Sequence, residues 1–245
     1  MRLNKFLAHA GICSRRKADE LIKQGRVKVN SKVVQTLGIK IDPNKDKVEV
    51  DDKVVVLTNS YIYLVLNKPV EVITSLRDPQ GRKTIMDFIP SSIKSKGVVP
   101  VGRLDYMSEG LVLLTNDKEL VHKLTHPRHH VPKSYIVKVK GSITEKKLKI
   151  IREGMVLNDG TVLAPVKVDV LNSNKKIHTF KMTLFQGINR QIRRMCKDLD
   201  LVVLKLLRIS IGPIKLKNLK PGKYRILSDD EVKELLRINT KGNLQ

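Results

Sequence analysis

Residues 102–117 read GRLDYMSEGLVLLTND, a polar loop followed at once by a strongly apolar strand. Gly102 and Gly110 bracket the loop, so Arg103 and Asp105 are expected at the rim of that strand, with rigid backbone on both sides. Such a position suits a reactive side chain. The simpler alternative is that Asp105 only forms a turn or a cap, which is the commoner role of an aspartate in a glycine-flanked loop.

The regions on either side of this stretch alternate between short apolar runs and helical patterns. Strands are expected at residues 61–67, 98–101, 111–115 and 135–141, around Asn172–Asn174, and as a pair around the Pro-Gly turn at 221–222. Helices are expected from Asp117, at 144–154, around 189–199, and from Ser228 to about Arg237. Short connections and several hairpins predict an α+β domain with a mixed, largely antiparallel sheet.

Two further polar stretches follow in this part of the chain. Tyr135 opens a strand two residues after Lys133, and the chain is only 4% aromatic and has no Trp. A strand tyrosine is usually packing surface, but here Tyr135 is one of few rings able to stack on a base. In GINRQIRRM, residues 187–195, Arg190, Arg193 and Arg194 fall within one helical turn. An arginine on the apolar side of that helix would point inward and would require a carboxylate partner.

The overall charge predicts a polyanionic partner. The chain has 48 Lys and Arg against 24 acidic residues, a net charge of +24 and a pI near 10.1. Its 245 residues, 41% of them hydrophobic, exclude a disordered chain, and its two cysteines exclude a disulfide framework. There is no run of about 18 apolar residues and no secretory h-region in MRLNKF, so we expect no membrane association and a cytoplasmic location.

The first 32 residues concentrate this charge, with nine Lys and Arg against Asp19 and Glu20. Two short helices are expected, ending at Gly11 and Gly25, followed by a hairpin that turns at Asn30 and Ser31. Arg15, Arg16 and Lys17 would lie in the first turn of the second helix, where cations oppose the helix dipole unless an anion binds there. A solvated charged face is the alternative.

These motifs together resemble a known family. MRLNKFLAHAGICSRRKADELIKQGRVKVNSKVV is similar to the S4-type RNA-binding domain. GRLDxxSxGL, K-x-Y and G-x-NRQIRRM, in this order, resemble the RsuA-type pseudouridine synthases that act on ribosomal RNA. The resemblance extends from the S4-like domain to about Arg237. With the residue patterns, it predicts an S4-like domain at residues 1–57, a linker at 58–60, a catalytic domain at 61–237 and a frayed tail at 238–245. Ser108, Ser134 and Asp200 depart from the family pattern, and only Asp200, where Gly is frequent, puts a turn in doubt.

The resemblance also assigns roles to residues. Asp105 is the catalytic aspartate, Tyr135 packs on the flipped uracil, Arg193 pairs with the aspartate, and Arg103 helps to displace the base. The expected RNA-binding residues are Arg103, Arg2, Lys5, Arg15, Arg16, Lys17, Arg26, Lys28, Arg190 and Arg194. The implied partner is ribosomal RNA, in the large subunit rather than the small one, either naked or in an assembly intermediate, and the protein is expected to be a monomer.

The chemistry of uridine isomerisation agrees with the residues present. The reaction breaks an N–C bond and forms a C–C bond without net redox change, so neither a cofactor nor a metal is expected, and the six histidines form no ligand set. An ionised carboxylate is required in a dry site, whether it attacks the sugar, attacks the base or removes a sugar proton. A neighbouring Arg193 would keep that carboxylate ionised.

Two other classes of protein share the charge. An S4-containing ribosome-assembly factor would bind RNA without modifying it, but a pure binder has no reason to place Asp105, Tyr135 and Arg193 in one dry pocket. A DNA-binding protein is disfavoured because no helix-turn-helix or zinc pattern is present.

Overall fold

The computed structural model describes residues 1–57, 61–174 and 176–238, so the predicted linker at 58–60 and residues 239–245 of the predicted tail lie outside the described residues. The chain divides into two compact units. The first comprises Met1–Ile62, Ser91–Val98 and Thr115–Lys118, and the second comprises Tyr63–Pro90, Val99–Leu114 and the chain from Glu119 onward. No helix within the described ranges is long and apolar enough to cross a bilayer.

The described residues of the first unit contain three helices and a four-stranded sheet. Its elements are α1 (Leu3–His9), α2 (Arg15–Lys23), β1 (Val27–Val29), β2 (Lys32–Val33), β3 (Val48–Val50), β4 (Lys53–Val54) and the short α3 (Ser91–Lys94). The strand order is β2-β1-β3-β4. Both predicted helices and the hairpin are confirmed: Ser14 Oγ accepts a hydrogen bond from the Lys17 N–H at 3.2 Å, and Asn30 and Ser31 take positive φ at the turn. Strands β3 and β4 were missed because their valines are separated by charged residues.

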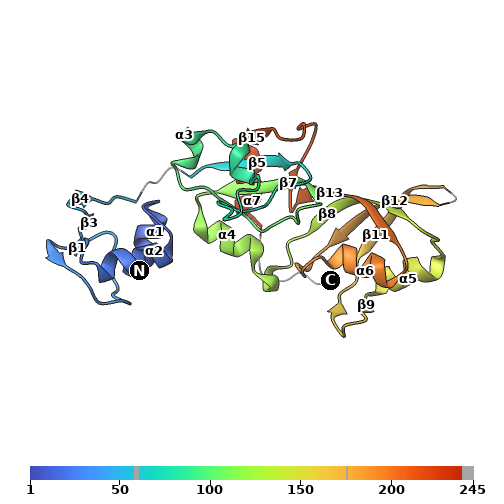
Figure 1. Ribbon diagram of the computed structural model, residues 1–245, viewed down its shortest axis with the longest axis horizontal. Coiled ribbons are helices and arrows are strands. Elements are labelled where there is room, and N and C mark those ends of the chain that lie inside the picture. The colour runs from blue at the N-terminus through green and yellow to red at the C-terminus, as the bar shows by residue number, and fades with distance from the viewer. Residues whose placement is uncertain (58–60, 175, 239–245) are drawn as a thin grey trace. The chain divides into compact units, whose positions relative to one another are not determined.

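The second unit contains a nine-stranded sheet (Figure 1). Its strands are β5 (Tyr63–Lys68), β6 (Val99–Pro100), β7 (Glu109–Thr115), β8 (Lys133–Lys140), β11 (Lys167–Ser173), β12 (Ile177–Leu184), β13 (Val202–Ile211), β14 (Ile214–Lys215) and β15 (Tyr224–Ile226). β9 (Met155–Val156) and β10 (Val162–Leu163) form a separate ribbon. The helices are η1 (Ile85–Phe88), α4 (Lys118–Thr125), η2 (Pro127–His129), α5 (Glu145–Glu153), α6 (Gln191–Asp198) and α7 (Asp229–Leu236).

The order of the large sheet is β11-β12-β8-β13-β7-β5-β15, with β14 paired to β13 and β6 to β7. Strands β11, β12, β8 and β13 pair antiparallel in succession, whereas β13 and β7 run parallel. The prediction of a mixed, largely antiparallel α+β fold is therefore confirmed.

One predicted strand pairing is wrong. The strands on either side of the Pro-Gly turn at 221–222 do not pair with each other: β14 pairs with β13, and β15 pairs with β5. The turn is bound to β5 instead, because Asn67 accepts from the Gly222 N–H through its main-chain oxygen and donates to the Leu219 oxygen through its side chain, at 2.8 and 2.7 Å.

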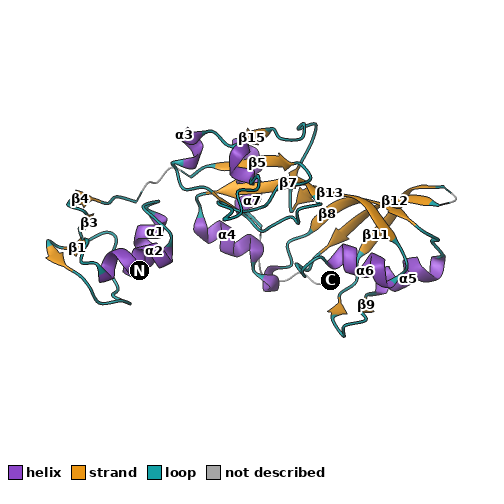
Figure 2. Ribbon diagram, viewed as in Figure 1, coloured by secondary structure: helices purple, strands orange, loops and turns teal. Residues whose placement is uncertain are grey.

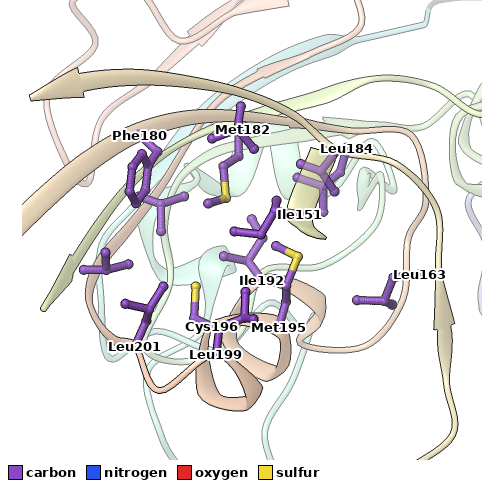
Figure 3. Packing of buried hydrophobic residues seen from close by; sticks show 14 of the residues in the cluster. Ile151, Leu163, Phe180, Met182, Leu184, Ile192, Met195, Cys196, Leu199 and Leu201 are labelled. Carbon is purple, nitrogen blue, oxygen red and sulfur yellow. The ribbon is translucent and has the colours of Figure 1, made fainter. Parts of the chain in front are cut away.

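Two hydrophobic cores pack against different strands of the sheet. Helices α5 and α6 cover one face of β8, β11 and β12 (Figure 2). Figure 3 shows Phe180, Met182 and Leu184 of β12 directed toward Ile192 and Met195 of α6. Burial of such side chains contributes roughly 1.5–3 kcal/mol each. A second core joins β5 and β7 to α4 and α7.

Candidate active site

Asp105 lies in the loop of residues 102–108 that precedes β7, and its side chain is half-buried. Every backbone carbonyl of this loop from Arg103 to Ser108 accepts a hydrogen bond. The donors are Arg208 to Arg103, Thr74 to Leu104, Ser108 N–H to Asp105, Glu71 N–H and Lys68 to Tyr106, Arg193 to Met107, and Lys68 to Ser108. The backbone that carries the carboxylate is thus tied to several separate segments of the second unit.

Three of these donors are cations. Lys68 at the end of β5 is fully buried and donates to the oxygens of Ser108 and Pro69 at 2.7 and 2.8 Å. Arg208 of β13 is 2% exposed and donates through Nε to Leu111 at 2.7 Å and through Nη1 to Arg103 at 3.5 Å. None of the three forms an ion pair within the described part of the chain, and the charges of Lys68 and Arg193 interact with the Asp105 carboxylate.

The expected ion pair between Arg193 and Asp105 does not form in the structure. The Arg193 guanidinium donates to the main-chain oxygen of Met107 at 2.7 Å and to Ser108 Oγ at 3.4 Å. Its charge still acts on Asp105: burial lowers the pKa of Arg193, and the Asp105 carboxylate opposes that shift. Arg193 lies in the first turn of α6, which brings it to the backbone of the loop rather than to its carboxylate.

A cavity of about 450 Å³, here named the Asp105 cavity, collects most of the predicted residues. Asp105, Tyr135, Arg103 and Arg190 line it, whereas Arg193 does not. Tyr135 lies on β8 between Met182 of β12 and Arg208 of β13, and its ring packs against the core under α6. The volume is within the range of small-ligand sites, and the wall holds one carboxylate among several cations.

Lys133 is a further cation of this cavity wall, on the same face of β8 as Tyr135. Burial, together with the nearby charge of Arg208, lowers its pKa to about 8. Burial likewise lowers the pKa of Lys68 to about 8, and the carboxylates of Asp105 and Glu109 oppose that shift. Of the two, Lys133 lines the cavity, and a cation whose charge is destabilised in this way favours an anion beside it.

The remaining predicted RNA-binding residues fall into two groups. Arg15 and Arg16 are exposed on the first turn of α2 and Arg2 is also exposed, while Lys5 is partly buried. Others form ion pairs within the chain: Lys17 with Glu20, Arg26 with Asp51, Lys28 with Asp52, and Arg194 with Asp159. Arg190 is exposed and takes a left-handed φ of +50° at the start of α6, so this helix begins at Gln191 rather than at 189.

Sequence reasoning missed Lys68 and Arg208 as site residues, although each left a signal. Lys68 ends the apolar run YLVLNK, and Arg208 lies in the apolar run VVLKLLRISI, which also contains Lys205. A charge within a buried strand needs several acceptors, and here the acceptors are main-chain oxygens of the Asp105 loop and of Pro69 and Leu111, which no residue pattern displays. The doubt about Asp200 is resolved: it takes a left-handed φ of +56°, the conformation that glycine would supply.

Comparison with known proteins agrees with this geometry. Residues 62–198 match the family model described as RNA pseudouridylate synthase, and residues 1–47 match the S4 domain. A crystal structure of a pseudouridylate synthase superposes with a TM-score of 0.70 at 30% identity, covering 96% of this chain and 99% of that chain.

Curated relatives match along nearly the whole length. An uncharacterized RNA pseudouridine synthase of Aquifex aeolicus is 43% identical over 97% of this chain and 94% of that protein. The ribosomal large subunit pseudouridine synthase B of Bacillus subtilis is 41% identical over 98% of each chain. The dual-specificity RNA pseudouridine synthase RluF of Escherichia coli K12 is 38% identical over 97% of this chain and 79% of that protein. The resemblance found in the motifs is confirmed, and the chain belongs to the RNA pseudouridylate synthase family, with an S4 domain in its first residues.

Proposed function

We propose that this chain converts specific uridines of ribosomal RNA into pseudouridine, with Asp105 as the catalytic carboxylate. The observation that carries the proposal is the Asp105 loop itself. All six main-chain oxygens from Arg103 to Ser108 accept hydrogen bonds, four of them from cationic side chains, and the carboxylate is left in a cavity of about 450 Å³. A fixed, ionised carboxylate is the group that this isomerisation requires.

Two cations interact electrostatically with Asp105. The charges of Lys68 and Arg193 both act on its carboxylate. Cations near a half-buried carboxylate offset the desolvation that would otherwise favour protonation. Three roles are considered for Asp105: attack on the sugar, attack on the base and removal of a sugar proton. Each of them requires the ionised carboxylate.

The other residues of the cavity take positioning roles. Tyr135 presents its ring from β8 for stacking on the uracil, and Arg103 and Arg190 stand exposed on the same cavity wall for phosphates. Removing the target base from its stack costs a few kcal/mol, which stacking and phosphate contacts offset. In the reaction the N1–C1′ bond breaks and the C5–C1′ bond forms, while C5 loses a proton and N1 gains one, so the product is an isomer of the substrate.

The substrate is proposed to be large-subunit ribosomal RNA. The relative in Bacillus subtilis named for the large ribosomal subunit matches 98% of this chain, and the match to the S4 domain at residues 1–47 supports a second RNA contact. We propose that the protein acts in the cytoplasm as a monomer, on naked RNA or on an assembly intermediate.

The test is a map of pseudouridines in total ribosomal RNA from cells with the protein, without it, and with only Asp105→Asn. We expect at least one large-subunit pseudouridine to disappear without the protein and to stay absent with Asp105→Asn. Identical maps in all three strains, combined with RNA binding by the purified protein, would instead support the assembly-factor alternative.

A further inference from the structure

A second cavity, of about 570 Å³, adjoins the Asp105 cavity in the second unit. We name it the Arg77 cavity; its walls include Arg77, Pro79, Arg82, Pro100, Arg103 and Val121. Gly102, Arg103 and Thr125 line both cavities. The segment Gly102–Arg103 is therefore a ridge between two neighbouring hollows, only two residues before Asp105.

The polar groups of the Arg77 cavity favour a phosphate. Across the described residues, the guanidinium groups of Arg77 and Arg103 have neither an ion pair nor a hydrogen-bond acceptor. The acidic residue, Asp78, is neutralised: Arg82 binds it through Nε and Nη2 at 3.0 and 2.8 Å and lowers its pKa to about 2. The cavity wall thus has two uncompensated cations and no uncompensated anion.

Besides Thr74, Ser75 and Thr125, the wall has several apolar side chains, which suit the flat face of a base. Pro79, Pro100 and Val121 contribute rigid or branched side chains from three separate segments, and Ile73 completes this side. Tyr106, 45% exposed, lies near enough to Arg82 for its phenol to act on the arginine's charge. In a chain that is 4% aromatic, an exposed ring beside this wall adds a stacking surface.

We infer that the Arg77 cavity holds the nucleotide next to the target uridine, its base against the apolar wall and its phosphate on Arg77, while Arg103 binds the phosphate that links the two nucleotides across the ridge. This inference rests on the proposed function and names a second subsite for the same substrate. Two hollows that share one ridge match two nucleotides that share one phosphodiester. Reading a neighbour of the target in this way makes the choice of uridine depend on its sequence context.

The test uses a synthetic RNA hairpin that spans a uridine mapped in the preceding experiment. Two matched hairpins lack only the base of the nucleotide 5′ or 3′ to the target and keep its sugar and phosphate. In single-turnover assays of the parent protein, we expect one abasic hairpin to raise the half-saturating protein concentration by about tenfold or more, as lost base stacking requires. The other abasic hairpin should behave like the intact RNA.

Three variants connect this effect to the cavity. Val121→Trp fills the space beside the apolar wall, so it should weaken binding of the intact hairpin by a similar factor. Binding of the sensitive abasic hairpin should not weaken further, because that RNA has no base to place there. Arg77→Ala should weaken all three hairpins alike, because the phosphate is present in each, and should make binding less salt-dependent. Lys83→Ala is the control. Lys83 is an exposed cation six residues after Arg77, and it does not line the cavity.

Several outcomes would overturn the inference. If the parent protein treats both abasic hairpins like the intact one, the cavity holds no neighbouring base. If the effects of Val121→Trp and base removal multiply, the base lies elsewhere. If Val121→Trp does not fold, two comparisons still test the inference. One is the parent protein on intact and abasic hairpins, and the other is Arg77→Ala against Lys83→Ala. A parent protein that converts no uridine in the intact hairpin contradicts the proposed function instead.

Discussion

Asp105 is the single residue on which the proposed chemistry depends. Asp105→Asn keeps the size of the side chain and removes its charge, so we expect pseudouridine formation to fall by a factor on the order of a thousand or more, as for loss of an essential acid–base or nucleophilic group. RNA affinity should stay within a few-fold, because the basic surface is untouched. Single-turnover assays and filter binding measure the two quantities, and comparable turnover by the variant and the parent would contradict the assignment.

Arg193 acts on Asp105 through its charge and on the loop through Met107. Arg193→Met removes both the cation and the 2.7 Å hydrogen bond. With less positive charge nearby, the carboxylate is more easily protonated, so activity should fall most at low pH and recover partly at alkaline pH. Arg193→Lys should rescue part of the rate by restoring the charge.

The matched control is Arg194→Met on the next position of α6. Arg194 binds Asp159 and Thr161 rather than the Asp105 loop. Its loss should leave the shape of the pH–rate profile unchanged. A profile that shifts for Arg194→Met and not for Arg193→Met would show that the wrong side of the helix has been assigned to the site.

The lowered pKa of Lys68 predicts how its contribution to stability changes with pH. Burial lowers its pKa from 10.5 to about 8, so between these values the unfolded chain binds a proton that the folded chain has lost. The contribution of Lys68 to the free energy of unfolding therefore rises as the pH increases through this window. Lys68→Met should accordingly cost more stability at about pH 9.5 than at about pH 7.

Urea unfolding of parent and variant at both pH values measures that difference. Lys140→Met, at an exposed position of β8, is the control and should cost the same at both. A Lys68→Met effect that is equal at the two pH values would mean that the buried amine does not lose its proton in this window.

At the scale of the elements, the contact between β7 and β13 is decisive, because it joins the strand after the Asp105 loop to the strand that carries Arg208. Gly110 has a φ of +106°, and a Cβ there would lie 2.3 Å from the main-chain oxygen of Arg208. Gly110→Ala should therefore separate the two strands and cost about 3 kcal/mol or more of unfolding free energy. Gly160→Ala, with a φ of +82° and open space around it, should cost only about 1–2 kcal/mol of backbone strain. Denaturant unfolding compares the two, and equal costs would show that the strands adjust to a Cβ.

The same scale shows what the sequence could predict. Helices α1, α2, α5 and α7 were expected because caps and apolar spacing are local signals: Ser14, Thr144 and Ser228 all cap as predicted. The pairing of β15 with β5 was not predictable, since it joins strands about 160 residues apart, where no local pattern fixes a partner. For the site, Asp105, Tyr135 and Arg103 were located from motifs and share a cavity, whereas Lys68 and Arg208 act on backbone oxygens and leave no pattern of complementary side chains.

At the scale of the whole molecule, the net charge of +24 predicts a strongly salt-dependent RNA affinity. Arg15 and Arg16 are exposed and without ion pairs in the described part of the chain, so both are available for phosphates. Replacing both with Ala should reduce the slope of log K against log salt by about 1.5. Replacing Lys149 and Arg152 of α5, which pair with Glu153 and Glu145, removes the same charge and should leave the slope nearly unchanged. Equal slopes for the two double variants would contradict RNA binding by α2.

The Asp105 loop has one more consequence, for how such a protein can diverge. Its position depends on six main-chain oxygens, which are the same whatever side chains the loop carries. Tyr106 and Met107 are exposed and can change identity without releasing those bonds. A lineage could therefore exchange the residues that face the RNA, and with them the preferred target, while inheriting an unaltered carboxylate. Deep mutational scanning should find positions 106 and 107 permissive for folding and selective for substrate, and position 68 intolerant of nearly every replacement.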